Sequence, residues 1–401
     1  MDRRIFLATI VSTSMTAAAR SNTSPELSGA ETDVTGLTKS TIPTPALIVD
    51  QEAFDANLIT MAEHCRQAKR QFRPHVKTHK CSDIARRQIA AGAIGVCVAT
   101  VSEAEAMVAA GITGVLLTSP IVDPLKITRM VRLVRQCPSV MLAVDSSRQA
   151  ELLASAATAA DLQVDVLVDI DIGDRRTGVL PGQPAVDLAQ QIAKCKQLQV
   201  VGVQAYAGHA SHVVGYEARD RVSREALGKA VETRRLLLRS GFDARILSGG
   251  SSGTYNIDST IDGVTELQVG SYIFMDVDYR RIGSRDGNPI YSDFRPSLTV
   301  LTTVINATHA DRVTIDAGTK SIDTTTTQRA EPKNWPGLIY TKAGDEFGAI
   351  SFEADARRPT IGDRIEFIVP HCDPSVNLYD RLYVCRGDAV TAVWKTSARR
   401  E

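Results

Sequence analysis

From Pro45 to about residue 275, short β-branched and apolar runs alternate with longer amphipathic segments rich in Ala and Leu. This alternation predicts βα units arranged around a parallel sheet. Nine strands are predicted, at residues 45–49, 71–76, 95–99, 114–118, 139–144, 164–170, 198–206, 244–248 and 264–269. Because a closed α/β barrel uses eight strands, we expect one of the nine to lie outside it.

Two neighbouring units repeat the same local pattern. Residues 90–96 (AAGAIGV) recur as residues 109–115 (AAGITGV), and each reads as a helix end, a glycine cap and the start of a buried strand. Between them, Ser102 and Glu105 have the spacing of a capping box and predict a helix start.

The pattern changes after about residue 276. Strand-like runs at residues 297–305, 312–315, 364–369 and 381–384 are separated by turn residues, without long helical segments. We therefore expect an α/β barrel over residues 43–275, followed by a mostly β domain over residues 276–395.

The first residues have the pattern of an export signal. Arg3 and Arg4 precede an apolar stretch that ends at Ala19 and is too short to span a membrane. Residues 1–25 therefore read as a twin-arginine signal peptide and linker, which predicts a periplasmic or secreted protein. If the two arginines are accidental, this segment is a disordered tail and the protein is cytoplasmic.

The balance of charge and the spacing of the cysteines limit which partners and sites are expected. The chain has 46 basic and 46 acidic side chains, so neither nucleic acid nor a membrane is an expected partner, and a small-molecule substrate is favoured. The seven cysteines are scattered without a CxxC pair, which indicates core residues and not a metal knuckle.

A basic run follows the strand predicted at residues 71–76. Residues 73–80 (RPHVKTHK) place Arg73, Lys77 and Lys80 beside two histidines. Neighbouring cations and a partly dry barrel mouth are expected to lower the pKa of Lys77, leaving a free amine that can form an imine with an aldehyde. The alternative is a solvated basic turn.

This run resembles the cofactor-lysine motif of the D-threonine aldolase, 3-hydroxy-D-aspartate aldolase and D-serine dehydratase family. Similar segments follow in order from about residue 43 to about residue 390. The resemblance implies an alanine-racemase-type (β/α)8 barrel with a C-terminal β domain, usually homodimeric. It also implies that Lys77 carries pyridoxal 5'-phosphate, with Lys80 as a supporting charge.

Two further segments match residues that surround the cofactor ring in the family. Residues 168–179 (VDIDIGDRRTGV) place Arg176 after a strand, where the resemblance implies contact with the phenolate oxygen; a surface salt bridge to Asp171 or Asp174 is the alternative. In residues 202–212 (GVQAYAGHASH), the resemblance implies that the ring is surrounded by Gln204, Tyr206 and His212. Strand alternation puts the first two on one face, although Tyr206 could equally be a core residue.

Glycine-rich turns after the last predicted barrel strands suit a phosphate, which needs backbone N–H groups and hydroxyls. Residues 248–254 (SGGSSGT) and the turn after residues 266–269 provide such groups. The predicted phosphate site consists of Ser248, Gly249, Gly250, Thr254, Gly270, Ser271 and Tyr272.

A possible metal site lies in the segment PHCDPSVNLYD. His371 and Asp373 have the i, i+2 spacing of the family's metal ligands, and a carboxylate suits Mn²⁺ or Mg²⁺ better than Zn²⁺. The dehydratase branch resembles His-x-Cys instead, and Cys372 is at the wrong offset for it. One departure from the family is Phe347, which replaces a histidine in an otherwise similar Asp-Glu-x-Gly stretch.

The resemblance, together with these residues, implies a lyase that cleaves D-3-hydroxy amino acids, of the D-threonine or 3-hydroxy-D-aspartate type, to glycine and an aldehyde or glyoxylate. His212 or a hydroxide on the metal is the candidate base. The alternatives are a D-serine or 3-hydroxyaspartate dehydratase, an amino-acid racemase, and a non-catalytic cofactor-binding protein.

Overall fold

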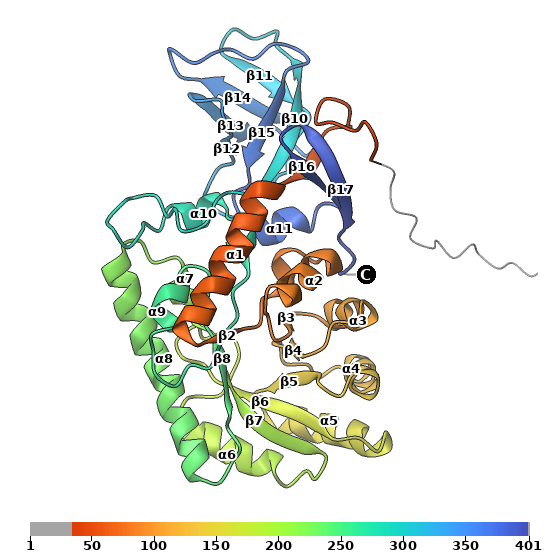
Figure 1. Cartoon of the computed structure of the whole chain (residues 1–401), viewed down its shortest axis with the longest axis vertical. Helices are drawn as coiled ribbons and strands as arrows, with labels where there is room; N and C mark the ends of the chain where they lie inside the picture. Colours follow the sequence, from red (N-terminus) through yellow and green to blue (C-terminus); the bar gives the residue numbers. More distant parts are fainter. Residues whose placement is uncertain (1–33, 400–401) are drawn as a thin grey trace, which may run out of the picture. The chain divides into compact units, whose positions relative to one another are not determined.

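The computed structural model describes residues 34–399, and the predicted signal segment lies outside them. An eight-stranded parallel sheet has the order β2-β9-β8-β7-β6-β5-β4-β3 (Figure 1). Its strands are β2 (Gln71–Phe72), β3 (Val96–Val98), β4 (Val115–Leu117), β5 (Met141–Val144), β6 (Val164–Asp169), β7 (Leu198–Ala205), β8 (Ile246–Gly249) and β9 (Glu266–Leu267).

The sheet curls until its two end strands approach each other. An isolated parallel bridge joins His75, just after β2, to Cys97 of β3, and the N–H of Ile94 donates to the carbonyl of Phe72 at 3.1 Å. This arrangement confirms the predicted barrel-type α/β fold.

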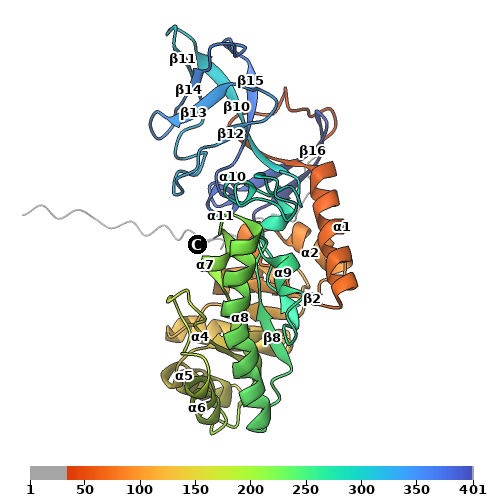
Figure 2. The same cartoon turned by 90° about the vertical axis from the view of Figure 1, so that its left-hand side faces the viewer.

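Helices follow the strands and cover the outside of the curled sheet (Figures 1 and 2). Polar N-caps start several of them; for example, Asp50 and Asp123 accept hydrogen bonds from the first-turn N–H groups of α1 and α4. The helices are α1 (Gln51–Ala68), α2 (Ser82–Ala90), α3 (Val101–Ala109), α4 (Pro124–Gln136), α5 (Ser147–Ala159), α6 (Gln183–Ile192), α7 (Gly208–Ser211), α8 (Tyr216–Arg239), α9 (Tyr255–Asp258) and α10 (Val277–Arg280).

The predicted glycine caps are confirmed, but the predicted capping box is wrong. Gly92 and Gly111 follow α2 and α3 with φ of 106° and 79°, values that favour glycine. Helix α3 is capped by Thr100, which accepts from the N–H of Glu103, and not by Ser102. Glu105 instead forms an ion pair with Arg129.

The ninth predicted strand belongs to a different sheet. Strand β1 (Ala46–Asp50) pairs antiparallel with β10 and parallel with β16 of the C-terminal region. Within the described residues, the chain therefore begins in the second sheet, forms the barrel and then returns to the second sheet. The residue limits expected for the two domains remain predictions.

The second sheet contains the four strands expected after residue 276, and the sequence analysis missed β12, β13, β14 and β17. Alternating burial along β13 and β14 shows why these strands are harder to recognise, since only one face of each is apolar. The elements are β10 (Leu298–Asn306), β11 (Arg312–Ile315), β12 (Glu331–Pro332), β13 (Leu338–Lys342), β14 (Gly348–Phe352), β15 (Arg364–Ile368), α11 (Cys372–Val376), β16 (Arg381–Arg386) and β17 (Ala389–Lys395).

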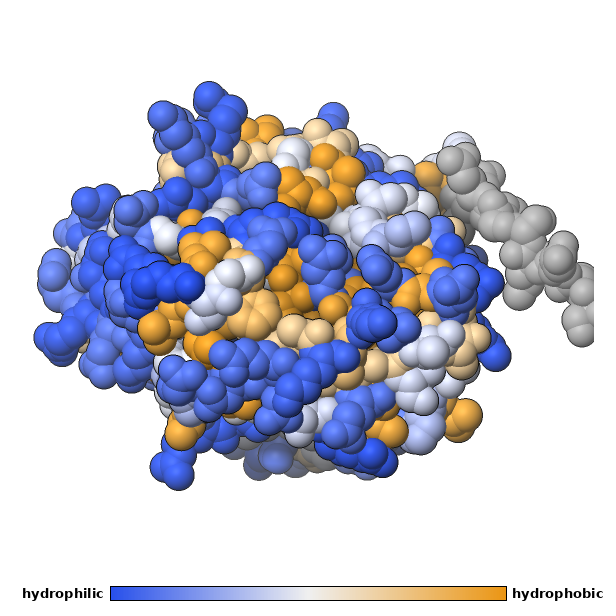
Figure 3. Space-filling view, turned by 90° about the horizontal axis from the view of Figure 1, so that it is seen from below, coloured by the Kyte–Doolittle hydropathy of each residue, from blue (hydrophilic) through white to orange (hydrophobic). Residues whose placement is uncertain are grey.

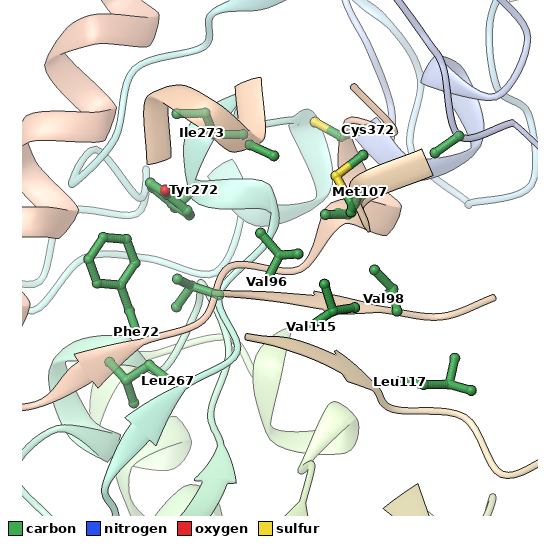
Figure 4. Packing of buried hydrophobic residues seen from close by; sticks show 14 of the residues in the cluster. Phe72, Val96, Val98, Met107, Val115, Leu117, Leu267, Tyr272, Ile273 and Cys372 are labelled. Carbon is green, nitrogen blue, oxygen red and sulfur yellow. The ribbon is translucent and has the colours of Figure 1, made fainter. Parts of the chain in front are cut away.

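One apolar cluster runs from the barrel strands to the segment that carries the predicted metal ligands. Val96, Leu117 and Leu267 of the barrel belong to the same cluster as Cys372 of α11 (Figure 4).

All seven cysteines are free and six are buried, as expected for core residues. The surface seen from below is largely hydrophilic (Figure 3). Among the described residues, no helix has the length and apolar character needed to cross a membrane.

A buried ion pair anchors the strand that leads to Lys77. Arg73 and Glu266 join neighbouring strands through two hydrogen bonds of 2.9 and 3.0 Å, and both side chains are almost fully buried. Arg73 also donates to the carbonyl of Gly114. A Cβ at Gly95 would lie 2.5 Å from the Arg73 guanidinium, so this position requires glycine.

Glu266→Gln should lower the free energy of unfolding by about 3–5 kcal/mol, because it leaves a buried guanidinium without its counter-charge. The midpoint of urea unfolding measures this loss. The control is Glu225→Gln, which removes an exposed pair with Lys229 (3.5 Å) and should cost less than about 1 kcal/mol. Equal losses in the two variants would contradict the anchoring role of Glu266.

Candidate active site

A cavity of about 290 Å³ opens where the barrel strands end and α11 approaches them. Nine of the predicted site residues line it, whereas five do not. The lining residues are Lys77, Arg176, Gln204, Tyr206, His212, Gly270, Ser271, His371 and Asp373. The predicted residues that do not line it are Ser248, Gly249, Gly250, Thr254 and Tyr272.

Lys77 lies in a single 3-10 turn, Val76–Thr78, with its side chain 39% exposed in the cavity. Its Nζ lies 3.4 Å from Oδ2 of Asp373. The Asp373 carboxylate raises the pKa of Lys77 above its ordinary value, despite opposing effects of burial and Arg176. The expectation of a lowered pKa is therefore wrong for this arrangement, because it considered the cations next to Lys77 in sequence and not the distant carboxylate.

The other cations of the basic run are neutralised by buried partners. Arg73 pairs with Glu266, and Lys80 Nζ lies 2.5 Å from Glu103. Burial lowers the pKa of His79 to about 4, so this histidine adds no positive charge at neutral pH. The run is thus a packed strand end and not a solvated basic turn.

Gln204 and Tyr206 face the cavity from the end of β7. The amide of Gln204 donates to the carbonyl of Thr118 at 2.7 Å and to Asp169 at 2.9 Å, which fixes its orientation. The guanidinium carbon of Arg176 lies 5.5 Å from the centre of the Tyr206 ring.

The alternative role of Arg176, a surface salt bridge, has no support within residues 34–399. Asp171 accepts from the N–H groups of Gly173 and Arg175. Asp174 contacts His209 instead. Arg176 therefore remains directed toward the cavity that it lines.

Serine hydroxyls and one close-packed glycine form one end of the cavity. Ser251, Ser252, Gly270 and Ser271 line it, and a Cβ at Gly270 would lie only 2.6 Å from the Thr78 hydroxyl oxygen. This close approach explains a glycine at that position. The predicted turn, residues 248–254, reaches the cavity through Ser251 and Ser252, which were not among the predicted phosphate residues.

The predicted phosphate residues outside the cavity support this turn from behind. The Ser248 hydroxyl accepts from Gln268 at 2.8 Å, and the Thr254 hydroxyl donates to Asp258. Tyr272 is buried and its hydroxyl accepts from the Gln88 amide at 3.1 Å. The side chains of Ser248, Thr254 and Tyr272 are buried and bonded to core residues. The local sequence does not indicate these distant partners.

Two aspartates at the start of α10, its N-cap Asp276 and Asp278 within it, face the two site histidines, and neither was predicted. Asp276 accepts from His371 Nδ1 at 2.9 Å, and Asp278 lies 3.3 Å from His212 Nδ1. The histidine rings are 6.4 Å apart between centroids. An acidic pair with i, i+2 spacing after the last barrel strand was the available signal, but nothing local connects Asp276 to a histidine 95 positions later.

The charge states of these groups depend on one another. Burial opposes a charged His371, but the hydrogen bond to Asp276 and its charge raise the pKa of His371 to about 9. Burial likewise opposes ionisation of Asp373, yet Lys77 and His371 lower its pKa overall. The Oδ1 atom of Asp373 is buried and, among the described residues, has no hydrogen-bond partner.

The residues fit both expected ligands. The cavity volume is close to the lower limit of about 300 Å³ for small-molecule sites, and it combines an amine, an aromatic ring and a hydroxyl-lined end. His371 and the unpartnered Asp373 oxygen are suitable donors for a divalent cation. In the described part of the chain, no group of three or more His, Cys, Asp or Glu side chains could hold a metal.

Comparison with known proteins gives the same picture over most of the chain. Residues 49–278 match the family model of the alanine racemase N-terminal domain, and residues 297–385 match the putative serine dehydratase domain. D-threonine aldolase from Arthrobacter sp. is 37% identical over 89% of this chain and 93% of its own length. The 3-hydroxy-D-aspartate aldolase of Paracoccus denitrificans (strain Pd 1222) is 32% identical over 91% of this chain and 94% of its own.

A crystal structure of D-threonine aldolase from Filomicrobium marinum has the same fold. It superposes with a TM-score of 0.86 and 35% identity, and the match covers 90% of this chain and 97% of that chain. The family models, the sequence identities and this fold agree with the resemblance first seen in the basic run around Lys77. The chain belongs to the D-threonine aldolase, 3-hydroxy-D-aspartate aldolase and D-serine dehydratase family of pyridoxal-phosphate enzymes, which have the alanine racemase fold.

Proposed function

We propose that the protein is an aldolase that cleaves D-3-hydroxy amino acids, using pyridoxal phosphate and a divalent cation. D-threonine or 3-hydroxy-D-aspartate would give glycine and an aldehyde or glyoxylate. This proposal rests on one observation: Lys77, Asp373, His371 and His212 line the same cavity. An amine, a pair of metal-type donors and a candidate base are the groups that this cleavage requires.

Each side chain has a task that follows from its position. Lys77 provides the amine that holds the cofactor, Tyr206 and Gln204 confine the ring, and the hydroxyl-lined end holds the phosphate. His371 and Asp373 would hold Mn²⁺ or Mg²⁺ beside the substrate hydroxyl. When bound, the cofactor accepts electrons from the α-carbon, and the cation acts as a Lewis acid.

His212 is the proposed base for the proton of the substrate β-hydroxyl. Burial lowers its pKa, which favours the neutral imidazole that can accept a proton. The carboxylate of Asp278, 3.3 Å from Nδ1, opposes this shift and would stabilise the imidazolium that forms after proton transfer. His212 is thus neutral before the transfer and stabilised after it.

The aldolase is favoured over the dehydratase by the donor at the second metal position. Asp373 lies in the cavity, whereas Cys372 is fully buried in the apolar cluster (Figure 4). Burial raises the pKa of the Cys372 thiol well above its ordinary value, so a thiolate ligand is disfavoured. Phe347 lies in the second sheet region, is 48% exposed and does not line the cavity, so its replacement of histidine leaves these donors in place.

Two wider proposals follow from the sequence. The twin-arginine pattern supports export to the periplasm or beyond, which would move a folded, cofactor-loaded protein. The family resemblance supports a homodimer.

Lys77→Ala should abolish covalent attachment of pyridoxal phosphate and lower the cleavage rate by at least about a hundredfold, because within residues 34–399 Lys77 is the one lysine that lines the cavity. Absorbance of the imine and borohydride trapping measure attachment. Glycine and keto acid are assayed with D-threonine, L-threonine, D-serine and 3-hydroxyaspartate. The control is Lys126→Ala, on the exposed face of α4. Keto acid as the main product from the wild-type enzyme would favour the dehydratase.

His371→Ala and Asp373→Asn should each remove stimulation by added Mn²⁺, because each deletes one of two proposed ligands. The measurement is the rate of D-threonine cleavage as a function of Mn²⁺ after chelation and dialysis. Wild-type-like stimulation in both variants would place the cation elsewhere. Glu346→Gln, on the exposed surface near Phe347, is the matched control.

Asp278→Asn should lower kcat by roughly ten- to a hundredfold with little change in the affinity for pyridoxal phosphate, because it removes the charge that stabilises protonated His212. Asp278→Glu should recover part of the rate. An unchanged kcat in Asp278→Asn would exclude this carboxylate from assisting the base.

A further inference from the structure

Arg219, on the first turns of α8, is a buried cation without a partner carboxylate. Its side chain is 0% exposed, and in the described residues no Asp or Glu lies within ion-pair distance of it. The charge of Asp293 favours the charged guanidinium from beyond ion-pair distance, but Tyr255 and Asn256 donate to that carboxylate. Burying an unpaired charge is costly, so its retention needs a reason.

The guanidinium joins three loops that border the active site. It donates to the carbonyls of Gly253 (2.8 Å), Val213 (2.9 Å), Ile282 (2.8 Å) and Gly283 (2.8 Å). These carbonyls belong to the hydroxyl-lined turn, to the residue after His212 and to the segment after α10. A single side chain therefore forms hydrogen bonds with the segments that carry the phosphate end, the proposed base and its supporting aspartates.

The turn at the phosphate end carries no positive side chain of its own. Ser251 and Ser252 are neutral, and behind them the fully buried Asp258 accepts from the Ser251 N–H and from the hydroxyls of Thr254 and Ser223. An anion thus lies behind a turn that is expected to face a second, doubly charged anion. Arg219 is the one Arg or Lys that bonds to residues 248–254 in the described part of the chain.

The turn also packs directly on the loop of the base. A Cβ at Gly253 would lie 2.1 Å from the carbonyl oxygen of Ser211, so the two backbones are in close contact. Arg219 bridges the same two loops from the side, through Gly253 and Val213. A shift of the turn would therefore be passed to His212.

We propose that Arg219 is a positioning residue that supplies the counter-charge for the cofactor phosphate and holds the loop of His212 against the phosphate turn. This inference rests on the proposed function, since it assumes that the turn binds the phosphate of pyridoxal phosphate. The guanidinium binds the turn at the Gly253 carbonyl in a buried region, where charges interact more strongly than in water. It would also offset the repulsion between the phosphate and Asp258.

The test compares binding of pyridoxal phosphate with binding of pyridoxal, which lacks the phosphate. Imine absorbance gives both affinities for the wild type, Arg219→Met, Arg219→Lys and the control Arg221→Met, an exposed position on the same helix. Arg219→Met should lower the affinity for pyridoxal phosphate by at least about tenfold and the affinity for pyridoxal by less than about threefold. Arg219→Lys keeps the charge and should retain most of the preference for the phosphate form, with a lower kcat because the directional bonds are lost.

A purely structural role predicts a different result. The proposed counter-charge role of Arg219 would be overturned if Arg219→Met lowered the affinity for both ligands equally. It would also be overturned if the Lys and Met variants lost the preference for the phosphate form equally. If Arg219→Met does not fold, the preference measured in Arg219→Lys decides: loss of that preference overturns the proposal. Failure of the wild type to bind pyridoxal phosphate refutes the proposed function itself, and this inference with it.

Discussion

The site depends on burying a cluster of positive charges at one strand end. Burial is possible because Arg73 and Lys80 each meet a buried carboxylate from another element, Glu266 and Glu103. Both cations are held in buried ion pairs, so Lys77 is the half-exposed cation of the run. The same pairs that stabilise the barrel therefore determine which lysine is available for chemistry.

The partner of Lys77 comes from α11, the helix between β15 and β16 of the second sheet. Asp373 lies in α11, and the preceding His371 is held by Asp276, which also accepts from the N–H groups of Cys372 and Tyr279. One buried carboxylate thus orients a proposed ligand, caps α10 and fixes the start of α11. The second sheet is part of the active site and not an appendage, which agrees with its apolar cluster being continuous with the barrel.

The sequence allowed prediction of the features that depend on local pattern or on a motif. Strand positions followed from apolar runs, and the residues around Lys77, Arg176 and Gln204 followed from the family motif. Contacts between distant segments could not be predicted, since nothing near Lys77 indicates that Asp373 would raise its pKa. For the same reason β1 was expected in the barrel region, although its hydrogen-bond partners lie about 250 and 335 residues later.

The connector between the last barrel strand and β10 concentrates the supporting contacts. Asp276 and Asp278 face the two histidines, and the carbonyls of Ile282 and Gly283 bind Arg219, which also holds the phosphate turn. The proposed base, the proposed metal donors and the proposed phosphate end are thus all held, directly or through Arg219, by one short stretch of backbone. A change in this connector that leaves every lining residue intact should still alter the distances on which proton transfer depends, because small displacements of reacting groups cost large factors in rate.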